Sequence, residues 1–467
     1  QVMGFFNTIF AQLNYARPQK SRILAQTSTM AKNSFRTVFG GQNFDAGGVF
    51  AGRHARNLFE MAGEVYRNVP AYIDLARDRD IDIASLTEFG QLPIMEKKYM
   101  IDHEMGNIAP EMIREYMTGN LISKRTSGST GQYLEILWSD ADYKRSMIEL
   151  WLRRGQYYDI YPKDKMLYFY TYNDGNTEYE YYKNTIGINK RLLLEECIEE
   201  TIEVIKNAKA AWALFQPSVV ALLCAYIKKH YEKSPISFKY VEFSGEVLTE
   251  TVRETAMQVF GCKVADQYGA NEVGSIAYEC PYGNKHIMRS NVFIEIVDDA
   301  GTVLANSEDL KTAEGNIVIT SKTNRTMPFY RYNLGDKVKI KNNSCCCGCS
   351  GKIIEVVAGR WNDYAVFEDG YKIHSYIFVE IFDFINKITD GTVKQFYIVQ
   401  KSYRQFDVML YVDDEIDGEY IERLFLTKLE NEHLKTSEFI FRYTDQLFEV
   451  CNGKKYMYFK NQTSKDW

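Results

Sequence analysis

The chain has 467 residues, of which 45% are hydrophobic and 25% charged, and a formal net charge of -6. This length favours two or three domains, and the acidic balance gives no footprint for nucleic acid or an anionic membrane. No apolar run approaches the roughly 20 residues that a membrane helix needs. No basic stretch precedes the apolar residues of 1–10, which argues against a signal peptide. We therefore expect a cytoplasmic protein without nucleic-acid or membrane partners.

The first two thirds of the chain alternate between helical and strand patterns. Helical spacing dominates residues 50–120, and a further helix is predicted over 139–156 with Ser139 as its N-cap. Strands are then predicted at 166–171, 240–244 and 263–267, and helices at 195–208, 218–229 and 249–260. This alternation predicts a mainly parallel sheet whose functional loops follow the carboxyl ends of its strands.

The pattern changes near residue 291. Short strands at 293–297, 316–320 and 337–340, separated by turn signals, predict a small antiparallel β unit. After residue 363, helices at 374–384 and 417–429 flank strands at 393–400 and 406–412, the outline of a small α+β lid. The predicted fold class is α/β. It comprises a large N-terminal domain of several subdomains, residues 1–361, and a C-terminal lid, residues 362–467.

A run of six small residues precedes an extended apolar segment at 133–138. The run consists of Thr126, Ser127, Gly128, Ser129, Thr130 and Gly131. Glycine lets the backbone approach an anion, and successive amides and hydroxyls can wrap phosphate oxygens. The run lacks the Gly-Lys-Ser/Thr ending of the common phosphate loop, because Gln132 follows Gly131. Taken alone, such a cluster more often marks a solvent loop.

Other motifs give the run a context. It resembles the phosphate loop of the adenylate-forming superfamily, and further motifs of that superfamily follow in the same order. Residues 267–272 resemble its Tyr-Gly-x-x-Glu element, 331–336 its Tyr-Arg-Thr-Gly-Asp element and 359–363 its Gly-Arg-x-Asp-Asp hinge. Gly453 and Lys454 lie near the C-terminus, where the family keeps a catalytic lysine. Residues 92–97 and 243–246 resemble the entry segment and the Gly-Glu turn of the phenylacetate-CoA ligase-like branch.

The resemblance implies roles for individual residues. Glu272 is expected to hold Mg²⁺, Tyr268 to stack on the adenine of ATP, and Asp336 to anchor the ribose. Lys454 is the expected catalytic lysine, which stabilises the leaving pyrophosphate, with its neighbour Lys455 as the alternative. The other nucleotide-binding candidates are residues 126–131 named above, Ser244, Gly245, Glu246, Gln267, Gly269 and Arg360, and Asn362 is the hinge candidate.

The implied reaction joins a small-molecule carboxylic acid to the α-phosphate of ATP and expels pyrophosphate. The acyl group then passes to a nucleophile, for which coenzyme A is the first choice. An amine, a hydroxyl or a carrier-protein thiol in a polysaccharide or natural-product pathway is the alternative. A non-catalytic nucleotide-binding scaffold is the second alternative, and a homodimer is one option for assembly.

Four of the nine cysteines crowd into residues 345–349. In a large intracellular enzyme, such crowding indicates a metal before a disulfide. Cys280 and His286, together with Cys345 and Cys347, form a soft, closed ligand set that favours structural Zn²⁺, and members of the resembling branch carry a similar pattern. Cys346 and Cys349 are alternative ligands, and a redox role is the alternative function.

Overall fold

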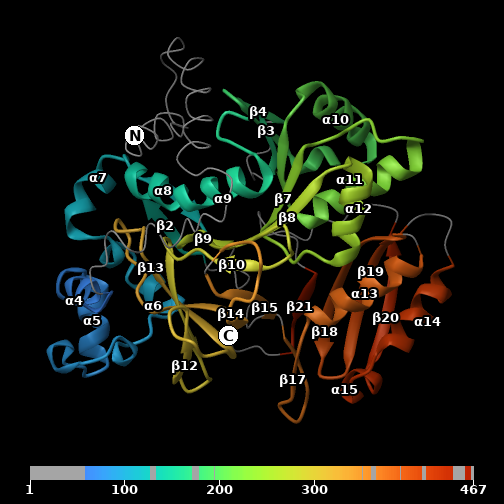
Figure 1. The fold of residues 1–467 in the computed structure, drawn as a ribbon. Coiled ribbons are helices and arrows are strands. Elements are labelled where there is room, and N and C mark those ends of the chain that lie inside the picture. Colours follow the sequence, from blue (N-terminus) through green and yellow to red (C-terminus); the bar gives the residue numbers. More distant parts are fainter. Residues whose placement is uncertain are drawn as a thin grey trace. The chain divides into compact units, whose positions relative to one another are not determined.

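The computed structural model describes residues 58–126, 133–170, 178–193, 195–349, 351–358, 364–389, 391–412, 417–444 and 458–463. These residues divide into two compact units. Unit 1 contains the described residues up to Thr126, together with Tyr133–Asp164 and Ala265–Val357. Unit 2 contains Lys165–Val264 and the described residues from Ala358 onward (Figure 1). The domain boundary predicted at residues 361 and 362 lies outside the described residues and stays a prediction.

Unit 1 begins with short helices. Pro70 occupies the first turn of its helix, where a missing N–H costs nothing. The helix predicted over 139–156 is interrupted at Met147, which ends one helix and begins the next. The α-helices are α4 (Leu58–Asn68), α5 (Pro70–Asp78), α6 (Lys97–Asp102), α7 (Ile113–Met117), α8 (Asp140–Ser146) and α9 (Ile148–Tyr158). The 3-10 turns are η1 (Ile83–Ser85), η2 (Phe89–Gln91), η3 (Glu104–Asn107) and η4 (Pro110–Met112).

The strands of unit 1 form a hairpin and a larger sheet. In the hairpin, β1 (Ile122–Arg125) pairs antiparallel with β2 (Glu135–Trp138). The sheet has the order β12-β11-β13-β14-β15-β10-β9-β8 within this unit. Antiparallel pairing of β11, β13 and β14 confirms the predicted antiparallel β unit. The strands are β8 (Lys263–Ala270), β9 (Gly274–Glu279), β10 (Lys285–Ile287), β11 (Val292–Val297), β12 (Val303–Asn306), β13 (Ala313–Ser321), β14 (Tyr332–Lys341) and β15 (Ile353–Ala358).

The first half of unit 2 is a sheet with the order β7-β6-β3-β5-β4. Its central pairings are parallel, and only the edge strand β4 runs antiparallel. Apolar side chains of the sheet, such as Leu167, Val241 and Phe243, share one core with the helices. The elements are β3 (Met166–Tyr170), β4 (Tyr179–Tyr182), β5 (Thr185–Asn189), η5 (Lys190–Leu193), α10 (Glu195–Ala208), β6 (Trp212–Phe215), α11 (Pro217–His230), β7 (Tyr240–Ser244) and α12 (Glu250–Phe260).

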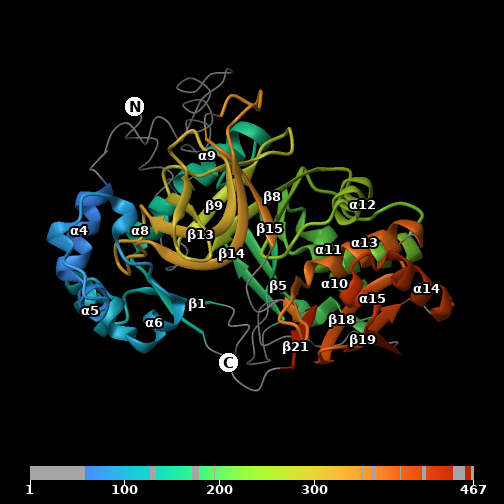
Figure 2. The same cartoon turned by 90° about the horizontal axis from the view of Figure 1, so that it is seen from below.

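The C-terminal half of unit 2 has its own aromatic core. Phe378 and Phe382 of one helix pack with Phe425 of another and with Phe406 of the sheet, and Figure 2 shows both helices beside β18 and β19. The sheet order is β20-β19-β18-β21. The elements are β16 (Tyr364–Val366), β17 (Lys372–His374), α13 (Tyr376–Ile388), β18 (Val393–Ser402), β19 (Gln405–Val412), α14 (Gly418–Lys428), α15 (Glu432–Lys435), β20 (Glu438–Thr444) and β21 (Phe459–Asn461). Over the described ranges, no helix combines the length and the apolar character needed to span a bilayer.

Candidate active site and metal centre

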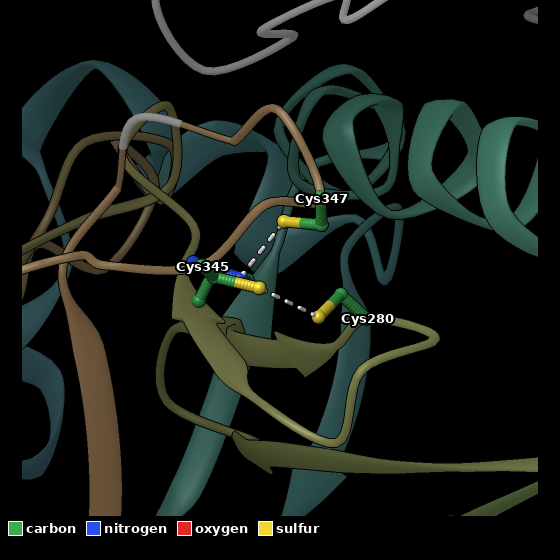
Figure 3. Close-up of side chains that lie close together, drawn as sticks. Cys280, Cys345 and Cys347 are labelled. Carbon is green, nitrogen blue, oxygen red and sulfur yellow. Dashed lines mark hydrogen bonds between the residues drawn. The ribbon is translucent and has the colours of Figure 1, made fainter.

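The four predicted metal ligands come together in unit 1. Cys280 directly follows β9, His286 lies on β10, and Cys345 and Cys347 lie in the connection from β14 to β15. The ligand atoms of these four residues all lie within 4.8 Å of one another. Figure 3 shows the three cysteine side chains pointing toward a common centre, with Cys280 Sγ and Cys345 Sγ 3.6 Å apart. Residues distant in the sequence thus form one compact set.

The ring of His286 is oriented for metal binding. Its Nδ1 lies 3.1 Å from the carbonyl oxygen of Gly351, so Nδ1 carries a proton and Nε2 is the nitrogen that becomes a ligand when a metal ion displaces its proton. Nε2 lies 3.1 Å from Cys347 Sγ. A buried imidazole with this tautomer, beside three sulfur atoms, fits a tetrahedral Zn²⁺ site.

Hydrogen bonds within the cluster oppose the effect of burial on the pKa values of His286 and Cys345. Burial opposes a charge on His286, but hydrogen bonds with Cys280 and Cys349 outweigh burial and raise the pKa of His286 to about 11. Burial also opposes ionisation of Cys345, yet hydrogen bonds from its neighbours lower its pKa to about 7. The side chains therefore share protons among themselves, and a cation that binds there displaces those protons.

The alternative ligands differ in position. Cys346 is exposed, whereas Cys349 is buried. Cys349 Sγ accepts hydrogen bonds from Arg153 Nη1 at 3.0 Å and from the Gly351 amide at 3.4 Å. Its sulfur is thus held by donors of the protein.

Tyr268 and Asp336, two of the predicted nucleotide-binding residues, are in direct contact. Tyr268 lies on β8 and Asp336 on β14, and the Tyr268 hydroxyl donates a 2.6 Å hydrogen bond to Asp336 Oδ2. Asp336 follows Gly335, whose φ of +83° suits glycine. The Gly335 amide also donates to Asn333 Oδ1 at 3.0 Å, so this irregular part of β14, where the register with β13 shifts, fixes the position of the carboxylate.

Glu272 lies in the turn between β8 and β9 and is only 2% exposed. Among the described residues, it accepts one hydrogen bond, from the Tyr332 hydroxyl to Glu272 Oε1 at 3.4 Å. This distance lies beyond the usual range for an O–H donor. A buried carboxylate with one long hydrogen bond is suited to a hard cation such as Mg²⁺. Motif reasoning did not identify Tyr332 as a partner of Glu272, because only the fold brings β14 to this turn.

The turn that carries Glu272 is tied to the strands that flank the predicted phosphate loop. Asn271 Nδ2 donates to the Arg125 carbonyl oxygen at 2.9 Å, and Trp138 Nε1 donates to the Asn271 carbonyl oxygen at 3.1 Å. Thr126 closes the base of the loop, because its hydroxyl accepts from the Leu134 amide at 2.9 Å. The loop residues themselves, 127–131, lie outside the described residues.

Two further predicted positions have structural explanations. Glu246 caps helix α11, because its carboxylate accepts from the Ser218 amide and hydroxyl, both at 3.0 Å. A Cβ at Gly269 would lie 2.9 Å from the Gly274 carbonyl oxygen, so the close approach of backbone there requires glycine. Nucleotide contacts of 244–246, Gln267 and Gly269 stay predictions. Arg360, Asn362, Lys454 and Lys455 lie outside the described residues.

Comparison with known proteins yields distant similarity. No family model matches the chain. Over 165 residues it is 26% identical to a phenylacetate-coenzyme A ligase of Thermus thermophilus, and the match covers 32% of this chain. The matched region of the chain thus spans only 36% of the length of this curated relative.

Among solved structures, similarity extends over the whole fold. A 2-hydroxyisobutyryl-CoA ligase in its postadenylation state, in complex with R3-HIB-AMP, has a TM-score of 0.67 at 13% identity, covering 96% of this chain and 94% of that one. An anthranilate CoA ligase in complex with anthranoyl-AMP has a TM-score of 0.51 at 14% identity, covering 72% and 65%. The predicted fold class, a large α/β part followed by a small α+β part, is confirmed. The chain thus has the fold of the adenylate-forming enzymes and resembles their phenylacetate-CoA ligase-like branch, as its motifs predicted.

Proposed function

We propose that the chain is an ATP-dependent ligase that activates a carboxylic acid as an acyl-adenylate and transfers the acyl group to coenzyme A. The observation that carries this proposal is the arrangement in unit 1. The buried Glu272 lies in the turn between β8 and β9, and its partner Tyr332 is on the same strand, β14, as Asp336, which accepts from Tyr268 of β8. The similarity to CoA ligases whose structures contain acyl-AMP supports it.

The first half-reaction brings two anions together, so the site must offset their repulsion and orient the attacking oxygen. Asp336 would accept from the ribose hydroxyls, and Tyr268, which donates a hydrogen bond to Asp336, would orient that carboxylate and stack on the adenine. Glu272 would hold Mg²⁺, which offsets the charge of the phosphates when bound. Residues 126–131 wrap the phosphate oxygens, and Lys454 stabilises the charge that develops as pyrophosphate leaves.

The second half-reaction requires a different surface for the acyl acceptor. We propose that residues 362–467 act as a lid that reorients about Asn362, since hinge residues absorb backbone rotation. The separate core of residues 365–459 supports a part that moves as one body. Coenzyme A is the acceptor we favour, since one of the similar structures contains both 2-HIB-AMP and CoA.

We further propose that Cys280, His286, Cys345 and Cys347 hold a structural Zn²⁺. Four protein ligands fill a tetrahedral site and leave no position for substrate. When bound, the ion would cross-link the β9–β10 hairpin to the loop before β15.

ATP–pyrophosphate exchange tests the reaction class. It should be measured over a panel of aromatic, fatty, hydroxy and amino acids for wild type, Lys454→Ala and the matched control Lys455→Ala. Acid-dependent exchange that collapses only in Lys454→Ala supports both the activity and the lysine assignment. Collapse only in Lys455→Ala moves the catalytic role by one position. No exchange with any acid, in protein that binds ATP, would favour the scaffold alternative.

Thioester formation distinguishes the acceptors. With the acid that supports exchange, consumption of coenzyme A and appearance of an acyl-CoA are expected. Stable acyl-adenylate in the presence of coenzyme A, followed by transfer to an amine, a hydroxyl or a carrier thiol, would instead support the alternative pathway.

A further inference from the structure

A fifth sulfur atom lies beside the metal centre and is held by a buried arginine. Cys349 is 5% exposed and Arg153 is 2% exposed, and the Arg153 Nη1–Cys349 Sγ distance is 3.0 Å. A hydrogen bond from a guanidinium to sulfur is charge-assisted. It uses one lone pair of the Cys349 sulfur, and Cys349 is not among the four residues whose ligand atoms all lie within 4.8 Å of one another. The Gly351 amide donates to the same sulfur at 3.4 Å.

The guanidinium is fixed from its other side by a carboxylate. Glu149 Oε1 accepts from Arg153 Nε at 3.2 Å and from Nη2 at 2.7 Å. Glu149 Oε2 accepts from the Ser290 amide at 3.0 Å and from the Ser290 hydroxyl at 2.5 Å. All three guanidinium nitrogens of Arg153 and both carboxylate oxygens of Glu149 therefore have a hydrogen-bond partner, which restricts the geometry of the pair.

Helix α9 also reaches the sulfur cluster at a second point. Residues 149, 153 and 157 are spaced four apart, so their side chains share one helix face. Arg153 Nη1 donates to the Tyr157 hydroxyl at 3.1 Å, and that hydroxyl lies 3.9 Å from Cys347 Sγ. One helix face thus contacts both Cys349 and a proposed metal ligand.

We infer that Arg153 is a positioning residue of the metal centre, which holds Cys349 outside the coordination shell and leaves three thiolates and His286 for the ion. The inference rests on the proposed zinc centre. Three thiolates and a divalent ion carry a net charge of -1, and a buried net charge is costly unless it is paired. The guanidinium supplies the opposite charge, and it cannot itself enter the shell because it has no lone pair to donate.

Titration of the metal-free full-length protein with Co²⁺ tests this inference without ATP or acid. The sulfur-to-cobalt charge-transfer absorption scales with the number of thiolates bound, and the visible bands report tetrahedral geometry. Wild type should show three thiolates. Cys349→Ser should show the same spectrum, with a dissociation constant changed less than about 3-fold, whereas the matched variant Cys347→Ser should lose about a third of the charge-transfer intensity.

The role of Arg153 needs a variant that does not leave Glu149 buried and unpaired. In Glu149→Gln/Arg153→Met, both charges are removed and the glutamine oxygen can still accept from Ser290. We expect a 10–100-fold weaker Co²⁺ affinity, the range typical of lost outer-shell partners, and a spectrum that mixes three- and four-thiolate forms. Adding Cys349→Ser should restore the single three-thiolate spectrum. Thermal melting of each variant establishes that it is folded.

The outcomes distinguish failure of the proposed role of Arg153 from failure of the proposed zinc centre. If Cys349→Ser loses about a third of the charge-transfer intensity, Cys349 is a ligand and the inference is overturned. An unchanged affinity and spectrum in the folded double variant would also overturn it, since Arg153 would then only pack. Failure of wild type to bind Co²⁺ would refute the zinc centre itself, and absence of ligase activity would leave the inference standing.

Discussion

Replacement of Glu272 by glutamine should stabilise the fold and remove the activity. The Glu272 carboxylate is 2% exposed and receives one hydrogen bond at 3.4 Å among the described residues. A buried charge with so little compensation retains much of its desolvation cost, which for an unsatisfied charged group exceeds the 1–3 kcal/mol of a neutral one. Glutamine has the same shape without the charge. We expect a gain of about 1 kcal/mol, which corresponds to a rise of about 2–4 °C in melting temperature for a unit of this size.

Asp142 provides a matched control, because its replacement by asparagine should lower the free energy of unfolding, whereas Glu272→Gln should raise it. Its Oδ2 accepts from the Arg325 amide at 3.0 Å and from the Thr326 amide and hydroxyl at 3.0 and 2.9 Å. Asp142→Asn removes a charge that is well satisfied and places an amide donor against donors. It should cost about 2–3 kcal/mol, since hydrogen bonds to charged groups contribute roughly 1.5–3 kcal/mol each.

Thermal melting and ATP–pyrophosphate exchange should be measured on both variants over a range of Mg²⁺ concentrations. Glu272→Gln should lower the exchange rate by about 10²–10³-fold, the effect typical of one lost electrostatic contact to the transition state, and raise the Mg²⁺ requirement. Destabilisation of Glu272→Gln to the extent seen in Asp142→Asn would identify a structural acid. Normal exchange in Glu272→Gln would refute the assignment of Mg²⁺ to this residue.

Three further predictions follow from single contacts. Tyr268→Phe removes the donor that orients Asp336 and should raise the KM for ATP in exchange about 10-fold with little change in kcat; an unchanged KM would show that Asp336 needs no orientation. His286→Gln should lose stoichiometric zinc, measured by elemental analysis, and melt at a lower temperature than wild type; retention of one zinc per chain would exclude His286 as a ligand. Asp309 binds Lys352 at 2.9 Å, and although burial opposes its charge, this lysine and backbone amides lower the pKa of Asp309. The contribution of the Asp309 carboxylate to the free energy of unfolding is therefore complete above the unfolded pKa of about 4 and is lost as the pH falls through the lower folded pKa. The difference in stability between wild type and Asp309→Asn should thus shrink below pH ~4. A difference that stays constant with pH would contradict the ion pair.

The metal ligands illustrate what the sequence can predict. Five residues lie between Cys280 and His286 within one hairpin, and Cys345 and Cys347 belong to one turn, so each half of the site is local. Soft ligand types in two short segments restrict the chemistry before any fold is known. Arg153 could not be found in this way, because Glu149 and Arg153 have the spacing of an ordinary exposed helical ion pair. Only the fold shows that this pair is buried against Cys349.

The interruption of the helix at Met147 is likewise a feature of secondary structure that the sequence alone did not predict. Helical spacing continues through 139–156, and nothing in the apolar pattern marks a boundary there. In the structure, Asp142 in α8 is bound to backbone at 325–326, and Asn291 donates to the carbonyl oxygens of Ser146 and Ser275 at 2.8 and 3.1 Å. These contacts from distant segments hold the carbonyl of Ser146 away from a continuous helix. Tertiary contacts thus override a local propensity.

The proposed metal centre and the proposed magnesium ligand lie at opposite ends of one strand, β9, which bears on how a bound ion could influence the proposed reaction. Glu272 precedes β9 and Cys280 follows it, so seven residues lie between them, six of which form the strand Gly274–Glu279. At roughly 3.4 Å per strand residue, the separation is about 20 Å, too far for the ion to polarise a phosphate or a carboxylate. An ion bound at Cys280 and His286 would instead fix the far end of β9 and its register with β10. Because β9 also pairs with β8, which carries Tyr268, fixing that register restricts where the Tyr268 hydroxyl and the Glu272 turn can lie. The metal would therefore act on the nucleotide site only through the geometry of the sheet.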